Sequence, residues 1–145
     1  PVLIELCREH AVFERARIGP GDEPARTQRL RDALSGPSPR LQAWLALESG
    51  AVLGYAAASL EFSTWAAREF VHLDCLYLRE AARNRGLGRR LLAQVLAFAR
   101  RRGCAQVQWQ TPRWNRGAIG FYRREGAVLR NKARFTYETG AASRF

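Results

Sequence analysis

A glycine-containing turn constrains the fold of this chain more than any other feature. The turn reads Arg83-Asn84-Arg85-Gly86-Leu87-Gly88-Arg89 and follows the apolar, aromatic-rich stretch Phe70–Leu78, which predicts a buried strand. Apolar residues then recur at helical spacing: Leu87, Leu91, Leu92, Val95, Leu96 and Ala99. A strand that enters a helix through glycines aims backbone N–H groups and the positive end of the helix dipole at one point. The pattern therefore predicts an α/β fold with an anion-binding turn.

The residues around the glycines narrow the type of anion. Arg83, Arg85 and Arg89 add positive charge, and a pyrophosphate would fit beside them. A P-loop needs Gly-Lys-Ser/Thr, whereas two arginines follow Gly88. A dinucleotide fingerprint needs a third glycine near position 91 and an acidic residue further on, but position 91 is leucine and residues 81–124 contain no acid. A plain glycine-rich turn without a ligand is the alternative.

The remaining periodic segments predict one domain of short helices and strands, which suits a chain of 145 residues with 47% hydrophobic and 26% charged residues. Further helices are expected from Val2 to about Arg17, over residues 24–35 and from Asn115 to about Glu125. Further strands are expected at Leu41–Glu48, Ala51–Leu60, Gln106–Thr111, Val128–Arg130 and Phe135–Glu138. Ser49-Gly50 is expected to close a hairpin, and residues 59–68 to form a connection around Trp65.

Charge is distributed unevenly along the chain. Residues 1–78 carry 8 arginines and 10 acidic residues, whereas residues 79–145 carry 15 arginines and Lys132 against 3 acidic residues. The first part is therefore slightly acidic and the second strongly basic, within a net charge of +11. A basic half favours a phosphate-bearing partner. Charge alone leaves a nucleic acid, a membrane and a nucleotide cofactor all open.

Several classes of protein are excluded by what the sequence lacks. No apolar run approaches the ~18 residues that a membrane span needs, so no membrane partner is expected. The first residues show no signal-peptide pattern, and the expected location is the cytoplasm. Cys7, Cys75 and Cys104 are widely spaced and form neither a metal-ligand set nor a disulfide framework, so no metal is expected.

Two motifs give the chain a resemblance to a known family. Arg83-x-x-Gly86-x-Gly88 matches the acetyl-CoA signature of the GNAT N-acetyltransferase superfamily, and Leu73–Leu78 resembles the strand before that signature. Trp114-Asn115-x-x-Ala118-x-x-Phe121-Tyr122-x-x-x-Gly126-Ala127 resembles the family's second cofactor motif. Within the superfamily, Ala11-Val12-Phe13-Glu14 and Ser63-Thr64-Trp65 resemble the diamine, spermidine/spermine and thialysine acetyltransferases. The resemblance covers roughly residues 1–138.

The resemblance implies a mixed, mostly antiparallel central sheet flanked by helices, with splayed central strands that hold acetyl-CoA. The family's usual first strand has no counterpart here. The whole of residues 1–145 is expected to form one acetyltransferase domain, with residues 1–69 mainly on the acceptor side and 70–130 as the acetyl-CoA-binding core. The family also implies a homodimer to which the C-terminal strands contribute.

Site residues are likewise implied by matching positions. Backbone groups of the central strand would bind the pantetheine arm, the turn would bind the pyrophosphate, and the following helix would complete the site. The implied cofactor-binding residues are Leu76, Tyr77, Leu78, Arg83, Asn84, Arg85, Gly86, Leu87, Gly88, Arg89, Asn115 and Ala118.

Acetyl transfer to an amine needs a proton acceptor for the amine and a proton donor for the leaving thiolate. By resemblance Tyr122 is the expected general acid and Asp74 the general base or a group that orients it. Tyr122 as a packing residue and Asp74 as half of an ion pair are the alternatives. Cys75 as an acyl carrier is a further alternative, although buried cysteines commonly behave as small hydrophobes. His10 is expected to be structural, on the apolar face of the first helix.

The acceptor is expected to be a small-molecule primary amine: a polyamine, a diamine or a lysine-like amino acid. Glu14 would attract its charge, and Phe13 and Trp65 would pack against its methylenes or face its ammonium group. Acetylation of a protein N-terminus, a protein lysine or an antibiotic amine stays open. Two alternatives are not enzymes: a nucleic-acid-binding module, and a family member that binds coenzyme A without catalysing a reaction. No recognition-helix or RNP pattern supports specific binding of nucleic acid.

Overall fold

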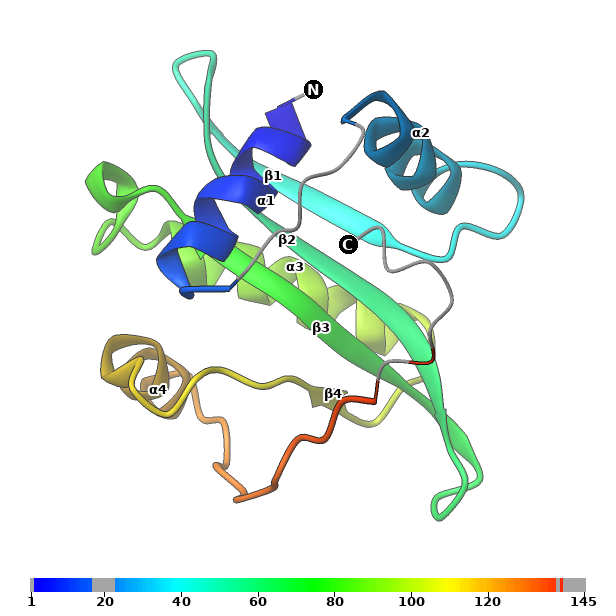
Figure 1. The fold of residues 1–145 in the computed structure, drawn as a ribbon. Helices are drawn as coiled ribbons and strands as arrows, with labels where there is room; N and C mark the ends of the chain where they lie inside the picture. Colours follow the sequence, from blue (N-terminus) through cyan, green and yellow to red (C-terminus); the bar gives the residue numbers. More distant parts are fainter. Residues whose placement is uncertain (1, 17–22, 138, 140–145) are drawn as a thin grey trace.

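A four-stranded sheet forms the centre of the protein, with helices on both faces (Figure 1). The computed structural model describes residues 2–16, 23–137 and 139. The elements are α1 (Val2–Phe13), α2 (Glu23–Leu34), β1 (Gln42–Glu48), β2 (Ala51–Ser63), β3 (Arg68–Leu78), the 3-10 helix η1 (Glu80–Ala82), α3 (Leu87–Arg101), β4 (Val107–Gln108) and α4 (Arg116–Arg124). Strands β1, β2 and β3 pair antiparallel, and β4 joins β3 in parallel. The expected mixed, mostly antiparallel sheet is confirmed.

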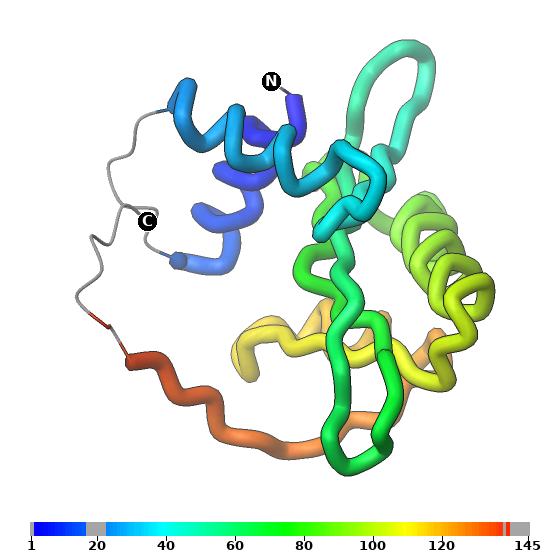
Figure 2. Tube along the Cα trace, turned by 90° about the vertical axis from the view of Figure 1, so that its right-hand side faces the viewer, coloured from blue at the N-terminus to red at the C-terminus, as the bar shows by residue number. Residues whose placement is uncertain are grey.

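The two faces of the sheet are covered by different helices (Figure 2). Helix α3 lies on one face, where its apolar stripe completes the main core. That core comprises Ala46, Ala56, Ala58, Val71, Leu73, Leu91, Leu92, Val95, Ala99 and Cys104. Helices α1 and α2 lie on the other side, where Leu6 of α1 is fully buried against Tyr55, Ala57 and Tyr77. Helices from the first and second parts of the chain therefore pack on opposite faces of one sheet.

A β-bulge at Asp74 shifts the alternation of the β3 side chains between the two faces of the sheet. Ala57 pairs with Cys75 and Ala58 pairs with Leu73, so Asp74 has no partner across the β2–β3 pair. Before the bulge, Leu73 packs into the core under α3, and after it Cys75 packs on the α1 side. Without the extra residue, strict alternation would place Leu73 and Cys75 on the same face.

Strands β3 and β4 separate soon after they meet. Their pairing is limited to Val71 with Val107 and His72 with Gln108. Among the described residues, no strand pairs with β3 beyond His72 on this side. The expected splayed strands are thus present, and the strand expected at Gln106–Thr111 is only two residues long because the chain diverges after Gln108.

The β2–β3 hairpin is longer than the sequence suggested. The connection expected over residues 59–68 is wrong, because pairing continues to Ser63 and Arg68 and leaves a turn of residues 64–67. Trp65 lies at this turn and is 98% exposed.

The ends of the chain also differ from expectation. Helix α1 ends at Phe13 rather than near Arg17, and Arg17 lies outside the described residues. The strands expected at Val128–Arg130 and Phe135–Glu138 are wrong within the described part, since residues 128–137 are exposed and no neighbouring strand pairs with them. Glu138 itself lies outside the described residues. None of the helices in the described ranges has the length and apolar character required to cross a bilayer.

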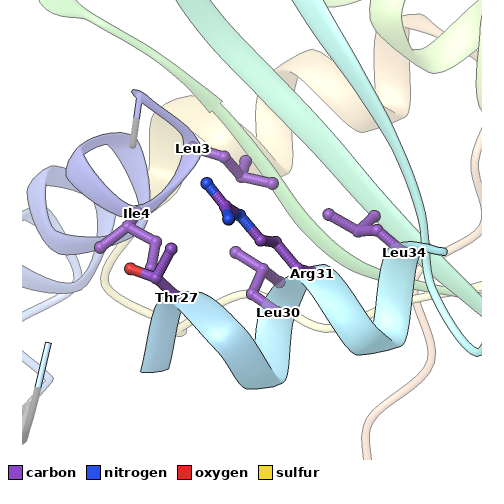
Figure 3. Close-up of a pocket in the computed structure, with 6 residues that line it drawn as sticks. All are labelled: Leu3, Ile4, Thr27, Leu30, Arg31 and Leu34. Carbon is purple, nitrogen blue, oxygen red and sulfur yellow. The ribbon is translucent and has the colours of Figure 1, made fainter. Parts of the chain in front are cut away.

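A small cavity of about 180 Å³ lies where α2 meets α1 (Figure 3). Its lining is formed by Leu3, Ile4, Thr27, Leu30, Arg31 and Leu34. None of the residues predicted to bind a substrate or cofactor belongs to it, so we assign it to packing between the two helices.

Candidate functional site

The glycine turn leads directly into the N-terminus of α3. Gly86 is the N-cap, with φ 77° and ψ −3°, a left-handed conformation that favours glycine. It offers no capping side chain, and the first helical bond runs from the Arg90 N–H to the Gly86 carbonyl at 3.1 Å. The N–H groups of a helix's first turn have no acceptor within the helix. The turn therefore has the geometry of an anion-binding site.

The three arginines of the turn have partners within the protein. Arg83 Nε donates to the Leu78 carbonyl at 3.0 Å, and its guanidinium lies 4.5 Å from the centre of the Phe13 ring. Arg85 pairs with Glu48 of β1, and Arg89 Nε donates to Glu125 at 3.0 Å. The arginines thus brace the turn against its neighbours, and the backbone amides are the donors that face an anion without an intervening salt bridge.

Close packing explains the second glycine of the motif. A Cβ at Gly88 would lie 3.4 Å from Cζ of Phe121 and 3.6 Å from Cδ1 of Leu78. The absence of a side chain thus lets α3 pack closely against α4 and the end of β3. Leu87 is buried, so its side chain belongs to the core and only its backbone can face a ligand.

The other predicted cofactor residues border the gap between β3 and β4. Leu76, Tyr77 and Leu78 lie on the part of β3 that has no strand neighbour on the β4 side among the described residues. Asn115 caps α4, where its Oδ1 accepts from the Ala118 N–H at 3.1 Å. The Nδ2 group of Asn115 stays available as a donor. Backbone edge, turn and capped helix fit an extended, phosphate-bearing group such as acetyl-CoA.

Tyr122 is half-buried on α4 between two aromatic rings. Its ring centre lies 5.0 Å from that of Trp109 and 5.2 Å from that of Phe121. Burial, with smaller contributions from the charges of Glu14 and Cys75, raises the pKa of Tyr122 to about 12. The phenol is therefore protonated at neutral pH and can donate to an anion.

Asp74 is exposed rather than buried in the strand. The bulge turns it out of the regular pairing, and its Oδ2 accepts from the neighbouring Cys75 thiol at 3.5 Å. Its carboxylate is therefore accessible to a substrate from solvent. Burial, reinforced by the charge of Asp74, raises the pKa of Cys75 to about 12. Cys75 is thus a protonated thiol, which disfavours the acyl-carrier alternative.

The end of α1 meets the loop before α4. Phe13 lies 6.2 Å from Tyr77 and 5.9 Å from Trp114, measured between ring centres. Glu14 follows directly and is close enough for its charge to act on Tyr122. The structure therefore brings Phe13 and Glu14 together with the predicted acid and the edge of β3.

Trp65 is not part of this group. The six steps of extended β3 between Arg68 and Asp74 span roughly 20 Å at the usual rise per residue, and Trp65 lies beyond them in the turn of the hairpin. It stands apart from the other predicted substrate-binding residues of the same chain.

Two groups near the site escaped the sequence reasoning. His10, expected to be structural, links Glu14 to Tyr55 through its two ring nitrogens. Arg79, which follows β3, makes three hydrogen bonds to Glu9 and one to Glu5, and so fixes α1 to the end of β3. The i,i+4 spacing of His10 and Glu14 was a visible signal, whereas Tyr55 is 45 residues from His10 and Arg79 is 70 residues from Glu9. Within the described residues, no cluster of histidine, cysteine or acidic side chains is arranged to hold a metal ion.

Comparison with known proteins agrees with this geometry. Among curated proteins, the bovine (Bos taurus) thialysine N-epsilon-acetyltransferase is 30% identical over 76 residues, 52% of this chain and 44% of that enzyme. The D-amino-acid N-acetyltransferase HPA3 of Saccharomyces cerevisiae is 29% identical over 122 residues, 81% of this chain and 72% of that enzyme. The match thus spans less than half of the bovine relative.

The fold is also found in solved structures. The aminoglycoside N-acetyltransferase AAC(6')-Iy in complex with CoA superposes with a TM-score of 0.68 at 19% identity, covering 79% of this chain and 87% of that one. A sequence profile described as the Acetyltransferase (GNAT) family matches residues 4–127, most of the chain. The protein therefore belongs to the GNAT acetyltransferases, a family that uses acetyl-CoA.

Proposed function

We propose that this protein is an acetyl-CoA-dependent N-acetyltransferase that transfers the acetyl group directly to a primary amine of a small cationic molecule. The acceptor class is a polyamine, a diamine or a lysine-like amino acid. One observation carries the proposal: the edge of β3 that has no strand partner among the described residues leads to the glycine turn, and Phe13, the neighbour of Glu14, contacts Tyr77 on that strand. The expected homodimer and cytoplasmic location belong to the same proposal.

The donor side follows from the backbone. When bound, acetyl-CoA supplies the acetyl group as an activated thioester. The amides at the start of α3 would hold phosphate oxygens, and the edge of Leu76–Leu78, which has no strand partner on the β4 side among the described residues, would hydrogen-bond the extended arm, as in strand addition. Tyr122 Oη would supply a proton to the leaving thiolate. Its position between Trp109 and Phe121 keeps the phenol in one orientation.

The acceptor side is acidic. Asp74, whose carboxylate the bulge leaves exposed, would accept a proton from the substrate ammonium group, directly or through water, so that the neutral amine can attack. Glu14 attracts the cation, and Phe13 packs against its methylenes. A relative whose name specifies thialysine supports the lysine-like class, since such an amine carries a carboxylate that offsets repulsion by a chain of net charge +11.

The proposal is tested by thermal unfolding with coenzyme A and acetyl-CoA, followed by thiol release with a panel of amines. A ligand at 100 times its Kd stabilises the folded state by about 2.7 kcal/mol, which gives a clear increase in Tm. The panel runs from spermidine and diaminopropane to lysine, thialysine and a short peptide. Increased Tm with turnover of one small-amine class is expected. Turnover of the peptide alone would reject the small-molecule acceptor, and an unchanged Tm with both donors would reject the donor site.

A further inference from the structure

His10 occupies a fixed position between α1 and the sheet. Its Nδ1 lies 3.2 Å from Tyr55 Oη of β2, and its Nε2 lies 3.4 Å from Glu14 Oε1 one helical turn later. The ring stacks on Tyr77 of β3, with centres 5.1 Å apart and planes 22° from parallel. The side chain is only 12% exposed. Each ring nitrogen therefore has one partner, and the ring cannot turn without losing both.

The partners determine the tautomer of His10. Burial lowers the pKa of His10, against the opposing effects of Glu14 and Asp74, so the ring is neutral at pH 7 and carries one N–H. A carboxylate accepts hydrogen bonds only, so this proton lies on Nε2 toward Glu14. Nδ1 then accepts from Tyr55, whose pKa is raised by burial and whose phenol therefore keeps its proton.

Glu14 connects this arrangement to the reaction. It lies just beyond the last turn of α1, beside Phe13, which contacts Trp114 at the start of α4. Its carboxylate lies 3.4 Å from His10 Nε2 and is close enough to Tyr122 for its charge to act on the phenol. A carboxylate accepts about four hydrogen bonds, so the bond from His10 leaves capacity for an ammonium group.

We propose that His10 is a positioning residue for the acceptor amine, which donates from Nε2 to Glu14 and holds that carboxylate where it binds the substrate ammonium group. The inference rests on the proposed function and adds a specificity device to it. A neutral donor orients Glu14 without cancelling its charge, whereas an arginine or lysine in the same place would form an ion pair and compete with the cationic substrate.

Binding of the amine should therefore depend on pH. The charged and titratable groups that face His10 are Glu14 on its own helix, Tyr55 on β2, and Tyr77 and Asp74 on β3. Protonation of His10 converts its contact with Glu14 into an ion pair. The KM for the amine should consequently rise as pH falls below the ordinary histidine range, while the KM for acetyl-CoA stays constant.

The kinetic test compares His10→Phe with His10→Gln. Phenylalanine keeps the stack on Tyr77 and removes both hydrogen bonds, and it should raise the amine KM about tenfold with little change in kcat. Glutamine keeps a donor and should restore part of the affinity. In a Glu14→Gln background, His10→Phe should cause no further increase in the amine KM, because the interaction that it removes is already lost. An unchanged amine KM in His10→Phe, or additive effects in the double variant, would overturn the proposal.

A second measurement is independent of turnover. The chain has two histidines, so His72→Gln leaves His10 as its single imidazole. The ¹⁵N chemical shifts of that ring should show the proton on Nε2 at pH 7.5, and Glu14→Gln should alter the Nε2 shift. A proton on Nδ1 would refute the inference even if the enzyme acetylates amines. Conversely, absence of turnover with every amine would refute the proposed function while the ring shifts still decide the state of His10.

Discussion

Burial raises the pKa of two ionisable side chains beside the gap between β3 and β4. Tyr122 and Cys75 both have a pKa raised to about 12, because the neutral form is favoured where water is excluded. Asp74, in contrast, is turned out of the regular pairing by the bulge and is exposed. The proposed donor and the proposed acceptor therefore lie in different environments, as acid–base chemistry needs.

Replacement of Tyr122 by phenylalanine tests the donor role. The ring would keep its contacts with Trp109 and Phe121, so folding and coenzyme A binding should change little. Loss of the proton donor should lower kcat about a hundredfold. Tyr137→Phe is the matched control, since Tyr137 is 88% exposed and far from the site in sequence. Equal kcat values for the two variants would contradict the assignment.

At the level of residues, the sequence indicated candidate members of the site but not the contacts between elements. Tyr122, Glu14 and the glycine turn were identified from motifs, and the structure packs Gly88 of the turn close to Phe121, the neighbour of Tyr122. The link from His10 to Tyr55 was missed because it joins residues 45 positions apart through a hydrogen bond that no local pattern encodes. For Trp65 the opposite holds: the motif was visible in the sequence, but Trp65 lies in the turn of the long β2–β3 hairpin, away from the other candidate residues.

The elements differ in how strongly their own residues specify them. Helix α3 formed as expected because its apolar stripe and flanking glycines agree with each other. The bulge on β3 was not predicted: Leu73 and Leu76, three positions apart, both pack on the α3 side, which regular alternation would not allow. The length of β4 was not predictable, because it depends on where a neighbouring strand diverges. The apolar residues within 128–137 did not form strands, because no neighbouring strand of the described residues pairs with them.

Gly86 allows a test of the turn as an element. Gly86 and Gly50 both have positive φ values, 77° and 80°, and a Cβ at either would meet nothing within 4 Å. Alanine at each should therefore cost a similar ~1–2 kcal/mol of stability from left-handed strain. Because only Gly86 caps α3, Gly86→Ala should also weaken coenzyme A binding, by about tenfold as its backbone shifts from the phosphate site. Isothermal titration of both variants would show this difference, and equal affinities would argue against a phosphate at the turn.

At the scale of the molecule, the two faces of the sheet are held by different forces. Helix α3 is attached by a large apolar core, whereas α1 has one fully buried residue, Leu6, and relies also on polar links. The main link is Arg79, which contacts Glu9 Oε1 at 2.7 Å, Glu5 Oε1 at 2.8 Å and the Val52 carbonyl at 3.0 Å. We therefore expect the attachment of α1 to be more sensitive to pH than that of α3.

Acid should reveal this link as a loss of stability. The hydrogen bonds from Arg79 lower the pKa of Glu9 below its ordinary value of 4.5. The stabilisation is thus present above that value and is lost as pH falls through the lower, folded-state pKa. In urea unfolding between pH 5 and 3, Arg79→Gln should show a flatter decline than the wild type. Arg29→Gln, which removes an exposed arginine of α2, should follow the wild-type slope; a parallel decline for all three proteins would exclude the link.

The open edge of β3 has a consequence for the life of the protein in a cell. Among the described residues, this part of β3 has backbone N–H and C=O groups without a strand partner on one side. Another polypeptide strand can pair with such an edge, which promotes aggregation. A bound cofactor would cover this edge and complete the sheet from outside the chain. The supply of coenzyme A would then affect how much of the folded protein avoids aggregation and degradation. A cell depleted of the cofactor would also lose part of the enzyme.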